Sequence, residues 1–255
     1  MSTPQSLPHA NTNSWPARLD LVQGASGLAL VLFMWVHMFM VSSILLGEDA
    51  MWLVSRGFEG EFLFGRPLPL LVSAIAAIVF CIFLLHALVA MWKLPGSYRE
   101  YRVIWQHSQR LQHTATSLWL VQVGTGLVLM FLASIHLYEM LMHPDQIGPY
   151  ASADRVVSGQ MWLLDLLLIF AAEVHAGVGL YRLIMKWDLF GLTQGAQRRR
   201  NTARLITGIV VFYLLLGLLT FAAYVRIGLD HREQAGERYV PSWQLPADSA
   251  QGGAD

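Results

Sequence analysis

Four histidines of this sequence lie inside long apolar stretches, where an ionisable side chain is costly and therefore indicates a function. They are His37, His86, His136 and His175, one in each stretch. A single buried histidine is as easily explained by a hydrogen bond between helices, but one in each of four stretches favours metal ligation by imidazole nitrogens. The only cysteine, Cys81, excludes cysteine-held zinc, all-cysteine iron–sulfur clusters and the CxxCH attachment of a c-type haem.

The elements that must position these histidines are five apolar segments, each long enough to cross a bilayer as a helix. Their expected ranges are 22–46, 69–92, 117–142, 161–186 and 205–225. Of all residues 55% are hydrophobic and 13% are charged, whereas soluble domains have about 25% charged residues. We therefore predict an all-α membrane protein with five transmembrane helices, the first four forming a four-helix bundle. This membrane domain spans 18–226, between a polar, disordered N-terminal tail at 1–17 and a polar C-terminal tail at 227–255.

The charges of the chain balance, with 17 basic and 17 acidic residues. No net positive field therefore attracts nucleic acid. Basic residues gather on one side of the predicted membrane domain, between the second and third spans and between the fourth and fifth: Lys93, Arg99, Arg102, Arg110, Arg182, Lys186, Arg198, Arg199, Arg200 and Arg204. Because cytoplasmic loops carry the excess of basic residues, we predict a cytoplasmic N-terminus and a periplasmic C-terminus.

The depths of the four histidines predict how they pair. Successive spans run in opposite directions, and each histidine lies past the midpoint of its own span. His37 and His136 therefore fall in the outer half, and His86 and His175 in the inner half. Two imidazoles at one depth suit a six-coordinate haem iron, so we predict that the bundle binds two b-type haems, stacked as an electron path. Zinc would need the histidines to converge at one depth, and copper more often recruits Met or Cys as well.

Small and polar residues near the histidines fit the same interpretation. Glycines on three of the four helices allow a flat porphyrin to approach the backbone, although they also serve plain helix packing: Gly24, Gly27, Gly124, Gly126, Gly177 and Gly179. Donors for haem propionates are expected near the inner ends of the spans, from Gln23, Ser26, Trp119 and Lys186. Each coordinated histidine is expected to donate its other N–H to a backbone carbonyl about one turn earlier.

Four motifs resemble a known family over residues 16–226, while the two tails do not match it. These motifs are LFMWVHMFMVSSILLG around His37, FEGEF with Glu59, SIHLY at His136 and AAEVHAGVGLYRL at His175. They resemble the dihaem cytochrome b subunit of menaquinol:fumarate reductases, a family that includes succinate:menaquinone reductases. The resemblance implies a membrane anchor in the bacterial inner membrane that is not a complete enzyme alone.

The resemblance also implies partners and a direction for the electrons. A flavoprotein subunit that reduces fumarate and an iron–sulfur subunit dock on the cytoplasmic side. Menaquinol is oxidised near the outer, distal haem of His37 and His136. Electrons then pass through the inner, proximal haem of His86 and His175 to those partners, or run in reverse from succinate.

Two carboxylates take roles from the resemblance. Glu59 stands where the family places the glutamate that accepts a proton from menaquinol. Glu173 stands at the position of a transmembrane proton relay that compensates the charge moved by the electrons. Since Glu173 lies two residues before His175, it is expected to point about 200° away from that histidine and off the haem face.

Three other functions fit parts of the pattern. One is the dihaem cytochrome b subunit of a hydrogenase or formate dehydrogenase, which the single histidine per span and the Glu59 loop disfavour. Another is a haem-free, proton-coupled transporter, and the third is a structural anchor whose haems do no redox work. The sequence leaves open the physiological direction, the quinone type, the haem potentials and the oligomeric state, a dimer of the heterotrimer included.

Overall fold

The chain folds into long helices that are interrupted by short ones. The structure, a computed structural model, describes residues 14–111 and 114–245, and in these ranges it contains no strand. Five helical segments are long and apolar enough to cross a membrane. They are α1 (Trp15–Val41) with the 3-10 turn η1 (Ser42–Leu46), α4 (Pro69–Met91), α6 (Thr114–Met142), α8 (Trp162–Trp187) and α9 (Ala196–Asp230). The prediction of an all-α protein with five membrane-spanning helices is confirmed.

The helix ends differ from the predicted ends because the apolar part of a helix is shorter than the helix itself. Helix α1 begins at Trp15 with a proline in its first turn, and α9 runs from Ala196 to Asp230. The predicted domain edges at 17 and 227 therefore fall inside helices. Of the predicted N-terminal tail, residues 1–13 lie outside the described residues. Of the predicted C-terminal tail, 227–230 are the last turn of α9.

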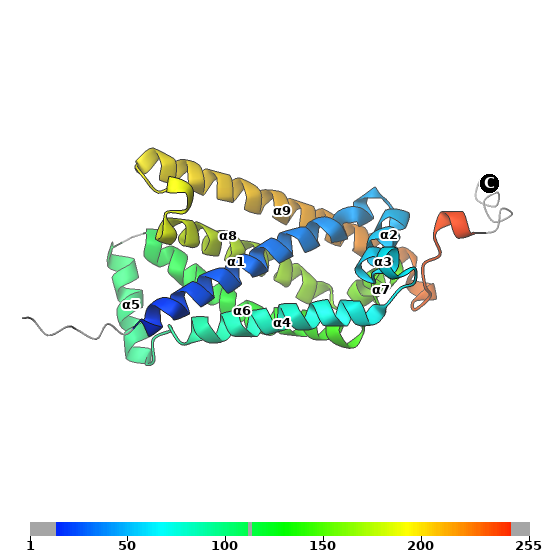
Figure 1. Cartoon of the computed structure of the whole chain (residues 1–255), viewed down its shortest axis with the longest axis horizontal. Helices are drawn as coiled ribbons and strands as arrows, with labels where there is room; N and C mark the ends of the chain where they lie inside the picture. Colours follow the sequence, from blue (N-terminus) through cyan, green and yellow to red (C-terminus); the bar gives the residue numbers. More distant parts are fainter. Residues whose placement is uncertain (1–13, 112–113, 246–255) are drawn as a thin grey trace, which may run out of the picture.

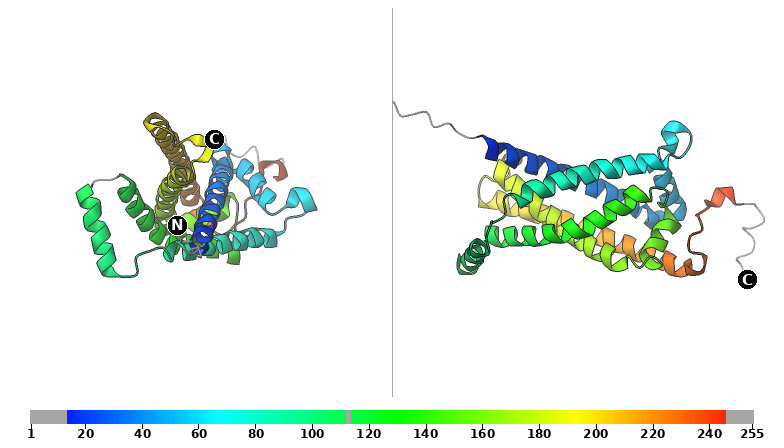
Figure 2. Two further views of the ribbon diagram at one scale, coloured as in Figure 1. Left: turned by 60° about the vertical axis from the view of Figure 1, so that its left-hand side comes forward. Right: turned by 90° about the horizontal axis from the view of Figure 1, so that it is seen from below.

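The four histidine-bearing helices pack in a ring. Helix α1 packs against α4, α4 against α6, α6 against α8, and α8 closes the ring on α1. Helix α9 lies outside this ring along α8 and α1 (Figures 1 and 2). Many large apolar side chains point away from the ring, among them Leu70, Phe131 and Leu205. Such a surface suits lipid.

Short helices cover the two ends of the bundle. At one end, called here the Glu59 end, lie α2 (Glu48–Phe58), α3 (Glu61–Phe64) and α7 (Pro149–Val157). At the other, called the Lys93 end, α5 (Tyr98–Leu111) lies across the bundle axis, and the 3-10 turn η2 (Leu189–Gly191) joins α8 to α9 (Figure 1). Two further 3-10 turns, η3 (Arg232–Gln234) and η4 (Ser242–Gln244), follow α9.

The buried apolar core lies at the Glu59 end, where η1, α2, α7 and α9 meet. Its members are Ile44, Met51, Ala153, Val156, Tyr224 and Ile227. A span-length criterion misses the short helices of this end, because they lie in the connections and are too short to cross a bilayer.

Candidate functional site

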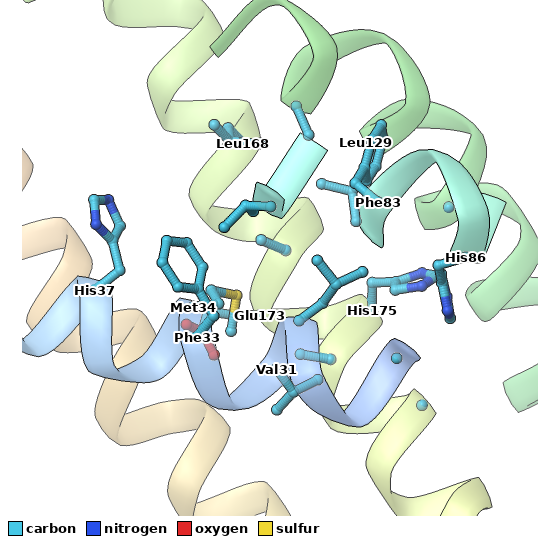
Figure 3. A pocket seen from close by; sticks show the side chains of 18 of the residues that line it. Val31, Phe33, Met34, His37, Phe83, His86, Leu129, Leu168, Glu173 and His175 are labelled. Atoms are coloured by element: carbon cyan, nitrogen blue, oxygen red, sulfur yellow. The ribbon is translucent and has the colours of Figure 1, made fainter. Parts of the chain in front are cut away.

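A large cavity runs through the inside of the helix ring. It has a volume of about 1320 Å³, and all four intramembrane histidines line it. Pockets for one small ligand measure about 300–1,000 Å³, so this cavity has room for more than one. Its lining is mostly apolar, with Val31, Phe33 and Leu129 among the side chains between the histidines (Figure 3).

The structure brings the histidines together in the pairs that their depths predict. The ring centroids of His37 and His136 are 6.4 Å apart, and the rings are inclined at 69°. The centroids of His86 and His175 are also 6.4 Å apart, at 87°. With metal–nitrogen bonds of about 2.0–2.1 Å, two imidazoles on opposite sides of one ion have centroids about 6.3 Å apart. Each pair therefore has the spacing that one iron between two imidazoles requires.

The two pairs occupy different levels of the cavity. In Figure 3, His37 lies at one side of the view and His86 and His175 lie together at the other, with Glu173 between them. Within the described ranges, no three or more histidine, cysteine or acidic side chains gather closely enough to hold a metal ion. This arrangement does not provide the convergence of histidines that a zinc site would need.

Helix α1 orients the ring of His86. The Nδ1 atom of His86 lies 3.2 Å from the backbone carbonyl oxygen of Gln23 and 3.1 Å from Oγ of Ser26. A carbonyl oxygen only accepts hydrogen bonds, so Nδ1 carries the proton and Nε2 is left for a ligand. The expectation that the carbonyl acceptor lies one turn earlier is wrong here. The ring instead reaches across to α1, because the packing of α4 against α1 brings the Gln23 carbonyl within hydrogen-bond distance.

Helix α6 orients the ring of His175 in the same way. The hydroxyl of Thr125 donates to the carbonyl of Val121 at 2.7 Å, so it accepts from Nδ1 of His175, 3.1 Å away. The side-chain amide of Gln122 donates to the other ring nitrogen, Nε2, at 3.2 Å. Gln122 must turn aside before this nitrogen can bind a metal. Sequence reasoning missed both Thr125 and Gln122, although each faces His175 from the helix that carries His136.

Two of the six glycines expected to contact a porphyrin lie against a histidine ring. A Cβ on Gly27 would come within 2.8 Å of Cε1 of His86, and one on Gly126 within 3.0 Å of Cε1 of His175. Only glycine leaves the space that these rings fill. Gly177 instead packs against Val210 of α9, where a Cβ would come within 2.3 Å of that side chain. The small residues therefore serve both the cavity and plain helix packing.

A polar cluster closes the Lys93 end of the cavity. Gln23, Trp119 and Lys186 line the cavity as expected for donors to an acidic group. Asp20 accepts hydrogen bonds from Lys93 and Lys186, and both lysines line the cavity too. Sequence reasoning missed Asp20 and Lys93, which stand just outside the predicted ends of their spans.

Unlike Gln23, Trp119 and Lys186, Ser26 does not line the cavity. Its hydroxyl donates to the backbone carbonyl of Val22 at 2.7 Å. Since its oxygen also lies 3.1 Å from Nδ1 of His86, Ser26 supports that ring, and its role as a propionate donor stays a prediction.

Glu59 lies at the end of α2, beside the cavity rather than in its lining. It is 6% exposed, and Arg56 donates to its Oε2 at 2.8 Å. Burial raises the pKa of Glu59, while Arg56 acts in the opposite direction. The neighbouring Phe58 lines the cavity, and its ring centroid is 6.5 Å from that of His37. Glu59 is thus one residue away from the His37 level of the cavity.

Glu173 is 1% exposed and lies on α8. Trp35 of α1 donates to its Oε2 at 3.3 Å, while Oε1 has no hydrogen-bond partner among the described residues. Glu173 lines the same cavity as the histidines, contrary to the expectation that it lies off their face. The reason is that α8 has α6 on one side and α1 on another, so more than one of its faces is interior. Trp35 was missed, although it precedes His37 by two residues as Glu173 precedes His175.

Comparison with known proteins identifies the family of this chain. Residues 98–233 match the family described as succinate dehydrogenase/fumarate reductase transmembrane subunit. The fumarate reductase cytochrome b subunit of Wolinella succinogenes is 45% identical over 226 residues, which are 89% of this chain and 88% of that protein. The fumarate reductase cytochrome b subunit of Helicobacter pylori is 43% identical over 219 residues, 85% of this chain and 84% of that protein. The chain therefore belongs to this family as a cytochrome b membrane subunit of fumarate reductase, one part of an enzyme complex and not an enzyme by itself.

Proposed function

We propose that the chain binds two b haems and links menaquinol to the fumarate-reducing partners of its complex. His37 and His136 hold one haem, and His86 and His175 hold the other. The observation that carries this proposal is the 6.4 Å separation of ring centroids in both pairs, at two levels of one cavity. When bound, the haems supply one-electron carriers on the two sides of the membrane midplane. Succinate oxidation with quinone reduction uses the same parts in reverse.

The polar ends of the cavity support the assignment of the two sides. Lys186, Gln23 and Trp119 at the Lys93 end are suited to the propionates of the haem held by His86 and His175. The basic residues near this end favour the cytoplasm, where the iron–sulfur and flavoprotein subunits dock. The N-terminus is then cytoplasmic and the C-terminus periplasmic, in the inner membrane of a bacterium.

Glu59 serves as the proton acceptor of quinol oxidation at the opposite end. Oxidation of a quinol to a quinone releases two electrons and two protons, so a base must stand near the ring. Burial raises the pKa of Glu59 from its usual acidic range, which makes a carboxylate a better base. The ring of its neighbour Phe58 lies close to the ring of His37, so a quinol beside Glu59 is also near the haem held by His37 and His136.

The test is a count of haem in the complex. The chain is co-expressed with its flavoprotein and iron–sulfur partners, and the complex is purified in detergent. The amount of b-type haem is then measured relative to the amount of flavin in the complex. Two haems per chain are expected. One haem would mean that one histidine pair has another role, and a colourless chain would contradict the proposal and favour a haem-free transporter.

Glu173 is proposed as the proton relay between the two levels, and Glu173→Gln tests it. Glutamine keeps the size of the side chain and an oxygen for the Trp35 hydrogen bond, but it cannot carry a proton. Moving one charge against about 100 mV costs roughly 2.3 kcal/mol, so electron flow without the compensating proton is opposed. We expect both haems to stay bound while quinol:fumarate turnover in sealed vesicles falls about 10-fold.

Glu139→Gln is the matched control for this variant. Glu139 lies near the end of α6 and pairs with the exposed His143 at 3.1 Å. Turnover is expected to stay at the wild-type level in this control. Normal turnover of Glu173→Gln would remove the relay from the proposal and leave a structural hydrogen bond to Trp35.

A further inference from the structure

The segment after α9 folds back over the Glu59 end of the molecule. Residues 231–245, named here the C-terminal strap, follow α9 and are drawn in orange to red in Figure 1. The backbone N–H of Gly236 donates to Oδ2 of Asp154 on α7 at 2.8 Å. Farther along, Tyr239 and Ser242 donate to Asp49 on α2, at 2.8 Å from the phenol and 2.7 Å from the serine hydroxyl. The strap is therefore fastened to two of the three short helices at the Glu59 end, α2 and α7.

A chain of contacts leads from the strap to Glu59. The rings of Trp243 and Trp52 meet edge to face, with centroids 5.6 Å apart at 79°. The Trp52 ring also contacts Arg56, whose guanidinium carbon lies 5.0 Å from the ring centroid. Arg56 then donates to Oε2 of Glu59 at 2.8 Å. Trp52, Arg56 and Glu59 follow one another at the four- and three-residue spacing that places side chains on one helix face.

The geometry points to a positioning role for the C-terminal strap: Trp243 holds Trp52 against Arg56, and Arg56 thereby holds the Glu59 carboxylate in one place for the quinol. This inference rests on the proposed role of Glu59 as proton acceptor. Most of the strap, from residue 234 on, lies beyond the residues that match the family.

The charges that face Glu59 decide the direction of the effect. Arg56 on α2 and Arg238 on the strap favour its charged form, whereas burial and Glu61 on α3 oppose it. Loosening the strap weakens the two favourable interactions, so the pKa of Glu59 rises. A base with a higher pKa stays protonated to a higher pH, and the acid side of the pH–rate profile moves upward.

The experiment compares Trp243→Ala and Trp243→Phe in the purified complex. The rate of fumarate reduction with a water-soluble 1,4-naphthoquinol is measured as kcat/KM from acid to alkaline pH. In Trp243→Ala the acid limb is expected to move up by about half a pH unit, which is about a 3-fold loss on the acid side. Phenylalanine keeps an aromatic ring against Trp52 and is expected to restore most of the wild-type profile. Haem content stays unchanged in both.

Asp49→Ala is a second variant that detaches the strap without touching either tryptophan. Hydrogen bonds from the Ser242 hydroxyl, the Ser242 backbone and Tyr239 lower the pKa of Asp49, so these contacts favour its charged form. Asp49→Ala is expected to reproduce the shift of the acid limb. Val240→Ala, an exposed position on the strap, is the control and is expected to keep the wild-type profile.

Glu59→Gln, measured in parallel, distinguishes a failure of the strap's positioning role from a failure of the proposed role of Glu59 as proton acceptor. If Glu59→Gln is inactive while Trp243→Ala and Asp49→Ala keep the wild-type profile, the strap has no positioning role. A uniform loss at every pH, with loss of haem, would also overturn the inference, because it would show a structural role. If Glu59→Gln oxidises the quinol normally, the proposed role of Glu59 fails, and the inference fails with it.

Discussion

His37→Ala is expected to remove one of the two haems and to lower quinol:fumarate turnover by at least about 100-fold, or about 2.7 kcal/mol in the activation barrier. In the structure the rings of His37 and His136 are the paired imidazoles of one level, 6.4 Å apart. Removing one imidazole would leave the haem iron with a single protein ligand. Axial ligands determine both how firmly the haem is retained and its reduction potential. The measurement is the haem count and the reduced-minus-oxidised spectrum of the purified complex, beside its turnover.

The pairing itself is tested by a double variant. If His37 and His136 hold the same haem, the double variant His37→Ala/His136→Ala loses one haem, as each single variant does, because the effects of groups that act as a unit are not additive. A variant that combines His37→Ala with His86→Ala loses both. His143→Ala is the control, since His143 is exposed at the Glu59 end and is expected to leave both haems in place. Two haems retained in His37→Ala would contradict the assignment of that pair.

The levels of the histidines follow from the sequence because depth depends on two things that a sequence shows. One is the position of each histidine within its apolar span, and the other is the alternation of direction between successive spans. Neither needs the side-chain packing. The same reasoning places Lys186 and Gln23 at the cavity end where the structure has them.

The groups that hold the rings in place depend on packing between helices, which single-helix reasoning cannot supply. The acceptors of His86 and His175 are a carbonyl of Gln23 and the hydroxyl of Thr125, both on facing helices. Their identity depends on the rotation and axial offset of one helix against another. For the same reason the contact of Ser26 with the ring of His86 could not be predicted from the sequence.

The Glu59 end shows a second limit. Its helices α2, α3 and α7 are short, and the strap is mostly polar with a single tryptophan, Trp243. Hydropathy and span length therefore do not predict where the strap lies. What fixes it is a set of side-chain hydrogen bonds between residues far apart in sequence, such as Tyr239 with Asp49. Long-range polar contacts of this kind leave no periodic pattern in a sequence.

Glu59→Gln is expected to slow quinol oxidation by about 100-fold while both haems stay bound, a loss typical of removing a general base. Glutamine fills the same space but cannot accept the quinol proton. In the wild type the rate rises with pH as Glu59 loses its proton, and because burial raises the pKa of Glu59 this limb lies at higher pH than an exposed glutamate would give. The limb should vanish in the variant, as measured by kcat/KM with a naphthoquinol across pH.

Glu61→Gln is the matched control, because Glu61 lies two residues after Glu59, at the start of α3. Arg56 also approaches Glu61, at 3.6 Å, and the charge of Glu61 raises the pKa of Glu59. Removing that charge lowers the pKa of Glu59, so the acid limb of this control should move to lower pH with its plateau unchanged. Reduction of the haems by dithionite and their reoxidation by fumarate should be normal in both variants, because neither carboxylate lies between the haems and the partner subunits. A Glu59→Gln complex that fails in this second assay would place the defect in electron transfer, and the proton-acceptor role of Glu59 would then be wrong.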